Sequence, residues 1–501
     1  MAEYVDKYAK TSLTGEEFHY EKEKLPKPVL EGLEDFIDLY YTAWETAFLN
    51  VDYVNKEGWK PILTCMPGCG FIWQWDSCFM TFITNYSNGT FTAFNNLDNL
   101  YRLQREDGYI SMAYDIEKEE PAYGELINPP LYSWVEWEQY LISGDSSRFA
   151  TVLPVLEGLY DYIEKNWRRN TGLYYYASCG AGGMDNSPRA AYGAFMNNGS
   201  DVAFVDLACQ QSLNAKYIAK ICEVLCETEK AEFYKKENER INALINKFHW
   251  SDKTGYYYDF FGRTNPEDKV KLINTKTAAA FWALLCGAVT KENITQMLSH
   301  LFNPEEFYPH TPFASLSKDD LNYDPDGGYW CGSSWHPTTF AAIRGIYEHG
   351  FPGFAREAAV KLLEVMSAVA KNPAYGGIWE CYSPEKDRPA TRECGLLVKP
   401  NFVGWGGIGP VTCLIENVIG LTFNAPENRI TFDVIHDRRS GLKNMKFNGG
   451  MVSIECTKYA RKHGDAEFEV EAEKPFTLFI KMSNNREREF EIPAGKTTIN
   501  F

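Results

Sequence analysis

A succession of amphipathic helical segments before residue 421 most constrains what this chain can fold into. Apolar residues recur at helical spacing in roughly a dozen segments, joined alternately by short connections and by long loops rich in Gly and Trp. This alternation is typical of helical hairpins that close into a ring and gather their long loops at one rim. We therefore expect a mainly α fold, with helices over 27–51, 76–103, 131–143, 147–166, 202–227, 230–248, 275–289, 292–301, 337–349, 354–369 and 410–421.

The residue pattern changes after Phe423, where apolar and polar residues alternate with the period of half-buried strands. The alternation is clear over 451–456, 467–472, 476–481 and 489–492, and glycine-containing turns separate these segments. We expect three parts: an N-terminal arm over 1–25, a helical barrel over 26–421, and a small β-sandwich or sheet over 422–501.

The charge balance of the 501 residues excludes several classes of partner. A formal net charge of −18 without basic runs argues against nucleic acid and against anionic membrane surfaces. No apolar run is long enough to span a bilayer, and residues 1–7 lack the apolar core of a signal peptide. A small molecule is therefore the expected partner, and the oligomeric state is left open.

The 13 cysteines are scattered along the chain. Three residues separate Cys65 from Cys69, and three separate Cys222 from Cys226, but neither pair has the further His or Cys ligands that a zinc site needs. We interpret the cysteines as reduced thiols of a cytoplasmic protein. We expect neither a metal ion nor an organic cofactor.

One loop presents a carboxylate among apolar and aromatic residues. Two glycines and a proline in Gly182-Gly183-Met184-Asp185-Asn186-Ser187-Pro188-Arg189 exclude regular structure. A carboxyl group in such surroundings has a raised pKa and can donate a proton. The competing interpretation is a simple turn in which Asp185 bonds its own backbone.

Other Gly-rich loops add a second carboxylate and further polar and aromatic residues. Glu380 is either a solvated residue at a strand end or a catalytic base. Asp76 either caps a helix or holds two sugar hydroxyls beside an indole ring. Arg189 pairs with Asp185 or binds substrate, and His336 is either a helix-start residue or part of the rim. The predicted binding residues are Trp73, Trp75, Asp76, Asn128, Arg189, Trp330, Trp335, His336, Tyr382 and Trp405.

Two carboxylates between aromatic walls are what an inverting glycosidase needs. One carboxylic acid protonates the departing oxygen, while the other, roughly 6.5–9.5 Å away, activates a water on the opposite face of the sugar ring. Aromatic walls exclude solvent and keep the acid protonated near neutral pH. The 15% content of aromatic residues fits this interpretation, because Trp and Tyr stack on the apolar faces of sugars.

The order and spacing of these blocks resemble the six-hairpin (α/α)6 glycosidases around glycoside hydrolase family 63, with the related trehalases and mannosylglycerate hydrolases. The resemblance covers about residues 30–421. It is carried by Trp73-Gln74-Trp75-Asp76-Ser77, Asn128-Pro129-Pro130-Leu131, Gly183-Met184-Asp185-Asn186-Ser187-Pro188-Arg189, Gly328-Tyr329-Trp330-x-Gly332, Trp335-x-Pro337-Thr338-Thr339 and Trp379-Glu380-x-Tyr382-Ser383-Pro384.

The resemblance implies an (α/α)6 toroid with a small C-terminal β-sandwich domain, and inverting hydrolysis of an α-glycosidic bond without a cofactor. It further implies that Asp185 is the general acid, that Glu380 is the general base, and that Trp75 and Asp76 line the sugar subsite. Arg189 matches the arginine of the acid's loop.

The chain departs from the family pattern at three points. Cys331 stands where many relatives have an arginine, and Asn128 stands where the trehalases have glutamine. We expect no counterpart of the N-terminal β domain that many family 63 members have. Since an arginine supplies a fork of hydrogen-bond donors, its loss bears on the identity of the substrate more than on the class of reaction.

We expect an exo-acting, α-glucosidase-like hydrolase of a small oligosaccharide or glycoside. Three alternatives remain at this stage. A glycoside phosphorylase would use one carboxylic acid and a phosphate site. A sugar isomerase or epimerase on the same barrel would use histidine, with His336 and His310 as loop candidates. A carbohydrate-binding protein would bind glycans without turnover.

Overall fold

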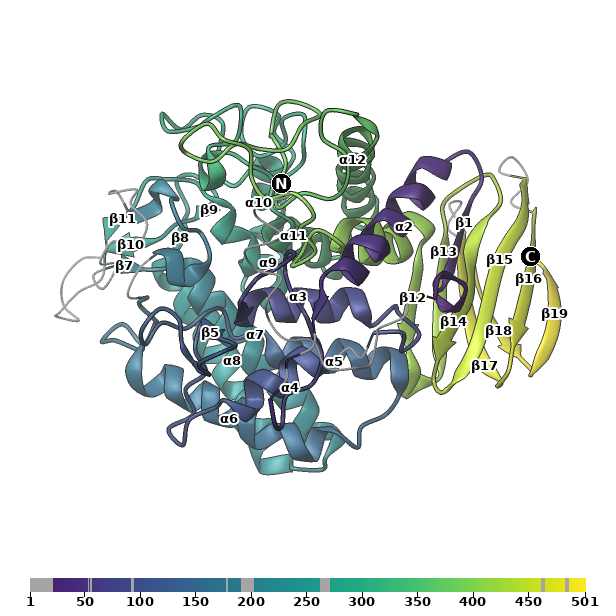
Figure 1. The fold of residues 1–501 in the computed structure, drawn as a ribbon, viewed down its shortest axis with the longest axis horizontal. Coiled ribbons are helices and arrows are strands. Elements are labelled where there is room, and N and C mark those ends of the chain that lie inside the picture. Colours follow the sequence, from purple (N-terminus) through teal and green to yellow (C-terminus); the bar gives the residue numbers. More distant parts are fainter. Residues whose placement is uncertain are drawn as a thin grey trace.

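The computed structural model describes residues 21–52, 54, 56–91, 94–176, 179–190, 202–261, 271–460, 465–482 and 486–501. Within this part, helices are the main regular elements before residue 420, and strands are the main regular elements after it (Figure 1). The helices are α2 Glu34–Leu49, α3 Gln74–Thr84, α4 Asn95–Arg102, α5 Tyr132–Ser143, α6 Phe149–Asn166, α7 Val205–Val224, α8 Thr228–Phe248, α9 Trp282–Cys286, α10 Ile294–Leu301, α11 His336–Glu348, α12 Pro352–Lys371 and the π-helix η6 Ile408–Ile419.

Alternate helices form a closed inner ring. Along the chain, α3 contacts α5, α5 contacts α7, α7 contacts α9, α9 contacts α11, α11 contacts η6, and η6 returns to α3. Every residue of α3 and of η6 is buried, as expected for helices that are enclosed on all sides.

The remaining helices form an outer layer around this ring. The outer helix α8, for example, buries a single stripe of Ala231, Tyr234, Ile241 and Ile245 and exposes its charged face. Two concentric layers of antiparallel helices confirm the predicted (α/α)6 toroid.

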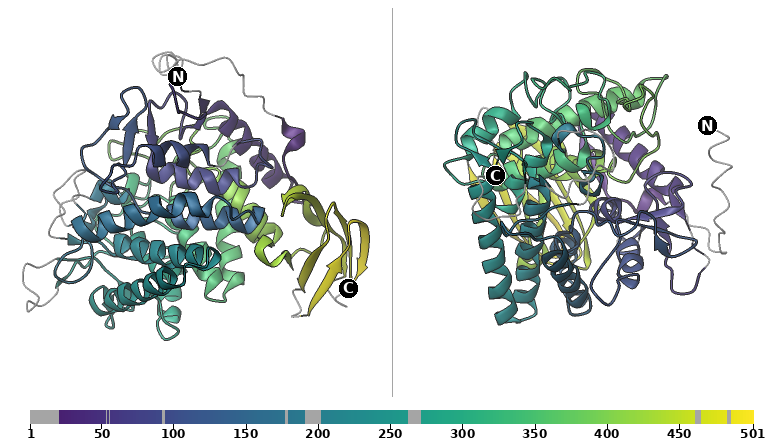
Figure 2. Two further views of the ribbon diagram at one scale, coloured as in Figure 1. Left: turned by 90° about the horizontal axis from the view of Figure 1, so that it is seen from below. Right: turned by 90° about the vertical axis from the view of Figure 1, so that its left-hand side faces the viewer.

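The β-sandwich consists of two sheets that lie beside the barrel (Figure 1 and the left view of Figure 2). One sheet has the order β1-β14-β15-β16-β19 and the other β12-β13-β17-β18. Side chains alternate between buried and half-buried along β13 and β17, which explains why these segments show a period of two. The strands are β1 Lys27–Leu30, β12 Leu421–Asn424, β13 Arg429–Val434, β14 Ser440–Phe447, β15 Gly450–Ala460, β16 Asp465–Ala472, β17 Phe476–Met482, β18 Glu487–Ile492 and β19 Gly495–Asn500.

The first strand belongs to the C-terminal sandwich although it precedes the barrel in the chain. β1 pairs antiparallel with β14, with Lys27 opposite Lys443 and Leu30 opposite Ser440. The apolar spacing predicts a helix from residue 27, but the first long helix begins only at Glu34. The predicted domain boundaries at 26 and 422 stay a prediction, and most of the predicted N-terminal arm lies outside the described residues.

The segment predicted as one helix over 76–103 is two helices, α3 and α4, separated by a loop. Helix α3 starts directly after the extended residue Trp73, and no side chain caps it. Asp76 therefore lies in the first helical turn, and the interpretation of Asp76 as a helix cap is wrong. The helix predicted over 275–289 is reduced to a short 3-10 turn and α9, because Gly287 at φ +87° ends it.

Short elements order the long loops at one end of the barrel. A small sheet β4-β5-β6 joins the start of α3 to the loop that follows α4, and η2, η3 and η5 shape the loops that carry the sequence motifs. These elements are β2 Val51–Asp52, β3 Ile62–Leu63, β4 Phe71–Trp73, β5 Ala113–Asp115, β6 Glu120–Pro121, β7 Val202–Ala203, β8 Trp250–Ser251, β9 Tyr256–Tyr257, β10 Phe260–Phe261, β11 Lys271–Leu272, η1 Lys22–Lys24, η2 Cys179–Gly182, η3 Pro188–Ala190, η4 Ala278–Phe281, η5 Tyr329–Cys331 and η7 Ala425–Glu427.

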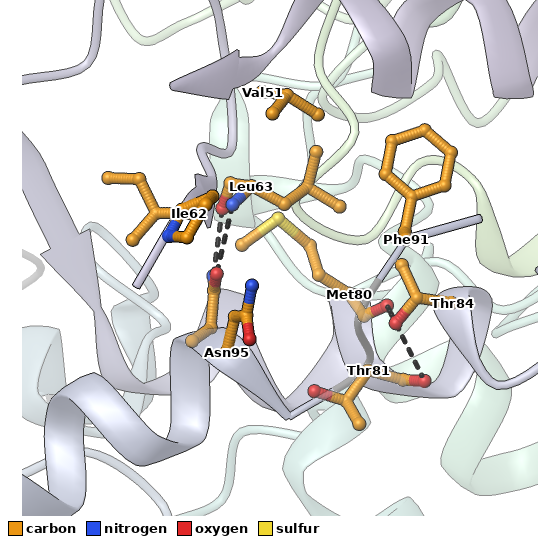
Figure 3. A pocket seen from close by; sticks show the side chains of 10 residues that line it. Val51, Ile62, Leu63, Met80, Thr81, Thr84, Phe91 and Asn95 are labelled. Carbon is orange, nitrogen blue, oxygen red and sulfur yellow. Dashed lines mark hydrogen bonds between the residues drawn. The ribbon is translucent and has the colours of Figure 1, made fainter. Parts of the chain in front are cut away.

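A small cavity of about 100 Å³, lined by both apolar and polar side chains, lies where β3 meets α3 and α4 (Figure 3). Leu63 N donates a hydrogen bond to Asn96 Oδ1 (2.9 Å), and Asn96 Nδ2 donates to Leu63 O (2.8 Å), which fixes the end of β3. This volume is below the roughly 300 Å³ of typical ligand pockets. The cavity is therefore a packing feature, and the ligand pocket lies elsewhere.

Candidate active site

A pocket of about 440 Å³ opens among the long loops at one end of the barrel. Most of the residues that the sequence singled out meet here, although they are spread over more than 300 positions of the chain. The predicted residues that line the pocket are Trp73, Trp75, Asp76, Asn128, Asp185, Trp330, Trp335, Glu380 and Trp405.

Asp185 lies in the loop between η2 and η3, which passes directly over Trp75. Gly183 has a φ of +79°, and a Cβ atom there would lie 1.4 Å from Trp75 Cζ3, so only glycine allows this approach. Asn186 fixes the loop to the opposite wall, because its Nδ2 donates to Gly328 O (2.9 Å) and its Oδ1 accepts from Trp330 N (2.8 Å). The carboxyl of Asp185 is thus held in the pocket by its neighbours in the loop.

The environment of Asp185 favours the protonated acid. Burial, with a smaller contribution from the nearby Glu380 carboxylate, raises the pKa of Asp185 from 3.8 to about 8. At neutral pH this group carries a proton that it can donate.

Glu380 is held by hydrogen-bond donors that favour the ionised form. Tyr329 Oη donates to Glu380 Oε1 (2.8 Å), and the backbone N–H of Lys399 donates to Glu380 Oε2 (3.1 Å). Burial raises the pKa of Glu380 above its usual range, while the Lys399 N–H, the Tyr329 hydroxyl and the Arg392 guanidinium lower it. The backbone of Glu380 is itself anchored, because its carbonyl accepts a hydrogen bond from Trp405 Nε1 (2.6 Å).

Tryptophan rings form the walls of the pocket. Trp330 stacks on Trp335 with ring centroids 4.1 Å apart and planes 4° apart, and Trp75 is stacked with Trp330 at 6.4 Å. At another point of the lining, Trp73 packs against Tyr123 at 5.3 Å. Flat aromatic faces of this kind suit the apolar faces of a sugar ring.

Asp76 and Asn128 are polar residues of the pocket lining. Asp76 is 6% exposed, and burial raises its pKa well above the usual range. Asn128 Nδ2 donates to Ala181 O (3.0 Å) and so supports the loop that leads to Asp185.

Arg189 does not line the pocket. Its guanidinium is fully buried and forms paired hydrogen bonds with Asp206 (2.6 and 2.9 Å) and with Asp259 (both 2.7 Å). Asp259 also accepts a hydrogen bond from Val205 N (2.8 Å), at the start of α7. Arg189 therefore ties the loop of Asp185 to the barrel, and its donor groups are committed to these two carboxylates rather than to a sugar.

His336 and Tyr382 are also buried behind the pocket wall. His336 Nε2 faces Met366 Sδ at 3.2 Å, and burial lowers the pKa of His336 to about 3. The Tyr382 hydroxyl accepts a hydrogen bond from Trp379 N (3.2 Å). His310, the other loop histidine considered for an epimerase, is exposed and bonds to Asp387 (2.6 Å).

Several pocket residues were missing from the predicted set. Tyr329 belongs to the block Gly328-Tyr329-Trp330-x-Gly332, and its position next to Trp330 is the signal that could have identified it as a pocket residue. Arg392, Glu393 and Lys399 follow the last recognised block, where no motif pointed to them. The further lining residues are Cys65, Met66, Met112, Tyr123, Gly180, Gly183, Asn186 and Phe402.

Neither a cluster of metal-ligating side chains nor a membrane-spanning helix is found in the described ranges. There, no group of three or more His, Cys, Asp or Glu side chains is placed to hold a metal ion. Among the same residues, no helix combines the length and the apolar character needed to cross a bilayer.

Comparison with known proteins gives one family. Residues 70–396 match the model of the mannosylglycerate hydrolase MGH1-like glycoside hydrolase domain. A protein of Borreliella burgdorferi, named only as uncharacterized, is 27% identical over 93% of this chain and 96% of its own length. The mannosyl-oligosaccharide glucosidase of Saccharomyces cerevisiae is 24% identical over 60% of this chain, and the match spans only 35% of that enzyme.

Among solved structures, a GH63 mannosylglycerate hydrolase from Thermus thermophilus in complex with glucose superimposes with a TM-score of 0.59. The match covers 75% of this chain and 99% of that protein at 18% sequence identity. This likeness establishes the fold.

Proposed function

The chain belongs to the mannosylglycerate hydrolase MGH1-like glycoside hydrolases, and on this premise we propose that it is an exo-acting, inverting hydrolase of an α-glycosidic bond. In this proposal Asp185 is the general acid and Glu380 the general base. The substrate is a small oligosaccharide or glycoside whose terminal sugar enters the tryptophan-walled pocket.

The reaction follows from the protonation states of the two carboxyl groups. Protonated Asp185 donates its proton to the glycosidic oxygen as the bond to the anomeric carbon breaks. Ionised Glu380 takes a proton from a water that attacks the same carbon from the opposite face, so the configuration inverts. Proton exchange with solvent then restores the acid and the base.

The contrast between the environments of the two carboxyls carries this assignment. Burial raises the pKa of both groups, that of Asp185 to about 8, while two hydrogen bonds that favour the ionised form oppose the increase at Glu380. Environments that push two neighbouring carboxyls apart in pKa identify the acid and the base of a glycosidase.

The pocket also supports the class of substrate. Its volume of about 440 Å³ suits one or two small units rather than a polymer, and aromatic rings form much of its lining. We favour an α-glucosidic linkage, because the yeast relative is named a glucosidase and the Thermus structure holds glucose.

A second substrate candidate is an α-glycoside whose leaving group carries a carboxylate. Arg392 and Lys399 line the pocket, and Arg392 lies over the Tyr329 ring at 4.9 Å. Guanidinium and ammonium groups at this position favour an anionic leaving group such as glycerate.

We also propose a cytoplasmic location, which the free thiols of the described cysteines support. Fractionation of the source cells tests it, and recovery of the protein from an oxidising compartment would contradict it.

The decisive experiment is an NMR time course of the purified protein with α-linked glucose disaccharides, glucosylglycerate and mannosylglycerate, with and without phosphate. We expect the β-anomer of the released sugar to appear first, without any need for phosphate. Initial release of the α-anomer would exclude inversion, and dependence on phosphate would identify a phosphorylase.

Variants test the two roles. Asp185→Asn and Glu380→Gln should each lower turnover by roughly two to four orders of magnitude while the fold survives. Asp387→Asn is the matched control, because this exposed carboxylate lies in the same loop as Glu380 but outside the pocket. Retained turnover in either of the first two variants would refute the assignment.

A further inference from the structure

Two thiols lie next to each other on the loop between β3 and β4, at the edge of the candidate active site. Cys65 Sγ donates a hydrogen bond to Cys69 Sγ across 3.7 Å. The residues are only 4% and 5% exposed, and Cys65 lines the pocket. The pocket thus gives a small reagent access to Cys65 and brings it beside the adjoining thiol of Cys69, and the glycosidase reaction uses neither thiol.

Backbone hydrogen bonds connect the loop of the thiol pair to the segment before Trp405, which lines the pocket. The Cys65 carbonyl accepts hydrogen bonds from the N–H groups of Val403 (2.7 Å) and Gly404 (3.2 Å), just before Trp405. A Cβ atom on Gly404 would lie 2.6 Å from Asp76 Oδ1 and 2.9 Å from Cys65 Cβ. Cys65 and the Asp76 carboxylate therefore both pack closely against Gly404. A displacement of Cys65 consequently also shifts Asp76.

The two thiols differ in character. The hydrogen bond from Cys65 lowers the pKa of Cys69, with Trp73 and Lys399 acting in the same direction. The same interaction, with burial, raises the pKa of Cys65. Cys69 therefore resembles an attacking thiolate, and Cys65 resembles the resolving thiol beside it.

We propose that Cys65 and Cys69 are a redox modification site at which a hydroperoxide forms a disulfide and thereby stops turnover. The Cys69 thiolate attacks the peroxide, which leaves Cys69 as a sulfenic acid and releases an alcohol or water. Cys65 then attacks the sulfenic sulfur and expels water. In balance, two thiols and one hydroperoxide give one disulfide, one alcohol and one water.

The loop can accommodate this change only by moving. The sulfur atoms must approach from 3.7 Å to about 2.05 Å. They lie at the two ends of a tight turn in which Cys69 N donates to Met66 O (3.3 Å) and Gly68 has a φ of +68°. Closing the turn removes the Cys65 thiol proton and shifts the residue beside Asp76, and a misplacement of about 1 Å in a catalytic site costs up to a hundredfold in rate.

Another thiol pair offers a contrast within the protein. Cys209 and Cys286 also interact, but they lie on the inner helices α7 and α9, are at most 1% exposed and do not line the pocket. No reagent that enters through the pocket reaches them directly. Selective oxidation of Cys65 and Cys69 is therefore the specific expectation.

The test uses the full-length protein in a Cys226→Ser/Cys394→Ser background, which removes two exposed thiols that do not line the pocket. The protein is titrated with hydrogen peroxide, remaining thiols are alkylated, and tryptic peptide 57–102 is sequenced by mass spectrometry. We expect this peptide to carry one alkyl group, on Cys78, in place of three, and to be two hydrogens lighter apart from these groups, with the link between Cys65 and Cys69, and dithiothreitol to reverse the change.

Turnover is measured on the same samples with the α-glycoside found active above, so the activity part of the test rests on the proposed function. We expect turnover to fall roughly tenfold to a hundredfold as the disulfide forms and to return with dithiothreitol. Cys69→Ser should keep its own untreated rate after peroxide.

Two outcomes would overturn the proposal. The first is a peptide that carries no intramolecular disulfide when oxidation elsewhere is complete. The second is full disulfide formation with unchanged turnover. Because the mass measurement needs no substrate, failure of the proposed function to appear is distinguishable from failure of the thiol pair to oxidise.

Discussion

Tyr329→Phe should change the pKa of the proposed base, Glu380, and leave the pKa of the proposed acid, Asp185, unchanged, so one pH profile distinguishes the two groups. The change removes the hydroxyl that donates to Glu380 Oε1 (2.8 Å) and leaves the second donor, the Lys399 N–H, in place. Tyr329 adopts a φ of +65°, a strain that phenylalanine carries equally, so backbone conformation is not a variable.

The magnitude follows from the lost hydrogen bond. A hydrogen bond to a charged, buried group contributes about 1.5–3 kcal/mol. Since one pKa unit corresponds to about 1.4 kcal/mol, the pKa of Glu380 should rise by roughly one to two units. Glu380 must be ionised to act as a base, so the acidic limb of the pH profile moves to higher pH by this amount.

The assay is the pH dependence of kcat/KM, which reports the ionisations of the free enzyme. Its alkaline limb belongs to Asp185, which must be protonated and has a pKa of about 8, and this limb should stay in place. Tyr123→Phe is the matched control, because its ring lines the same pocket beside Trp73. An acidic limb that does not move, with activity reduced equally at every pH, would refute the role given to Tyr329.

Three further changes test the structure around the site. Asp185→Asn should raise the Tm above about pH 8 and leave it unchanged below about pH 4. The reason is that the wild type loses stability between the usual pKa of this carboxyl, 3.8, and its folded pKa of about 8. Thermal unfolding across pH measures the effect, and an increase in Tm that is equal at all pH values would contradict it. Arg189→Met should cost roughly 3–5 kcal/mol in urea unfolding, because two buried aspartates lose their partner, and a loss below about 1 kcal/mol would show that the ion pairs are dispensable. Gly183→Ala should abolish most turnover by displacing Trp75. The control is Gly376→Ala, which has a similar φ of +64° but open surroundings and should show only the backbone strain. Equal effects of the two variants on turnover would argue against a role for the contact between residue 183 and Trp75.

The general course of the chain was accessible from its sequence because helical and strand periods are local. Segments such as α6, α8 and α12 were predicted within a few residues, since their apolar residues recur every third or fourth position. The same logic placed four strands of the sandwich, β15 to β18, and did not locate the others. It failed at α3 and α4, because the helix predicted over 76–103 runs through the turn residues Ser87-Asn88-Gly89 that separate them.

The candidate site was accessible in part because a resemblance in ordered blocks pointed to its loops. The blocks led to the two carboxyls and to the tryptophans, and the structure brings these side chains to one pocket. Arg392 and Lys399 were missed, because cations on a loop without a motif give no signal in sequence.

The periodicity of the sequence alone determined that the first part of the chain forms helices with buried apolar faces and that strands follow them. Tertiary structure decided which distant residues meet. It paired β1 with β14 across more than 400 residues, turned Arg189 inward to Asp206 and Asp259, and placed Tyr329 on Glu380. The reason is physical: period and turn chemistry act over a few residues, whereas burial and hydrogen-bond partners, which set the pKa values of the two carboxyls, exist only once the ring has closed.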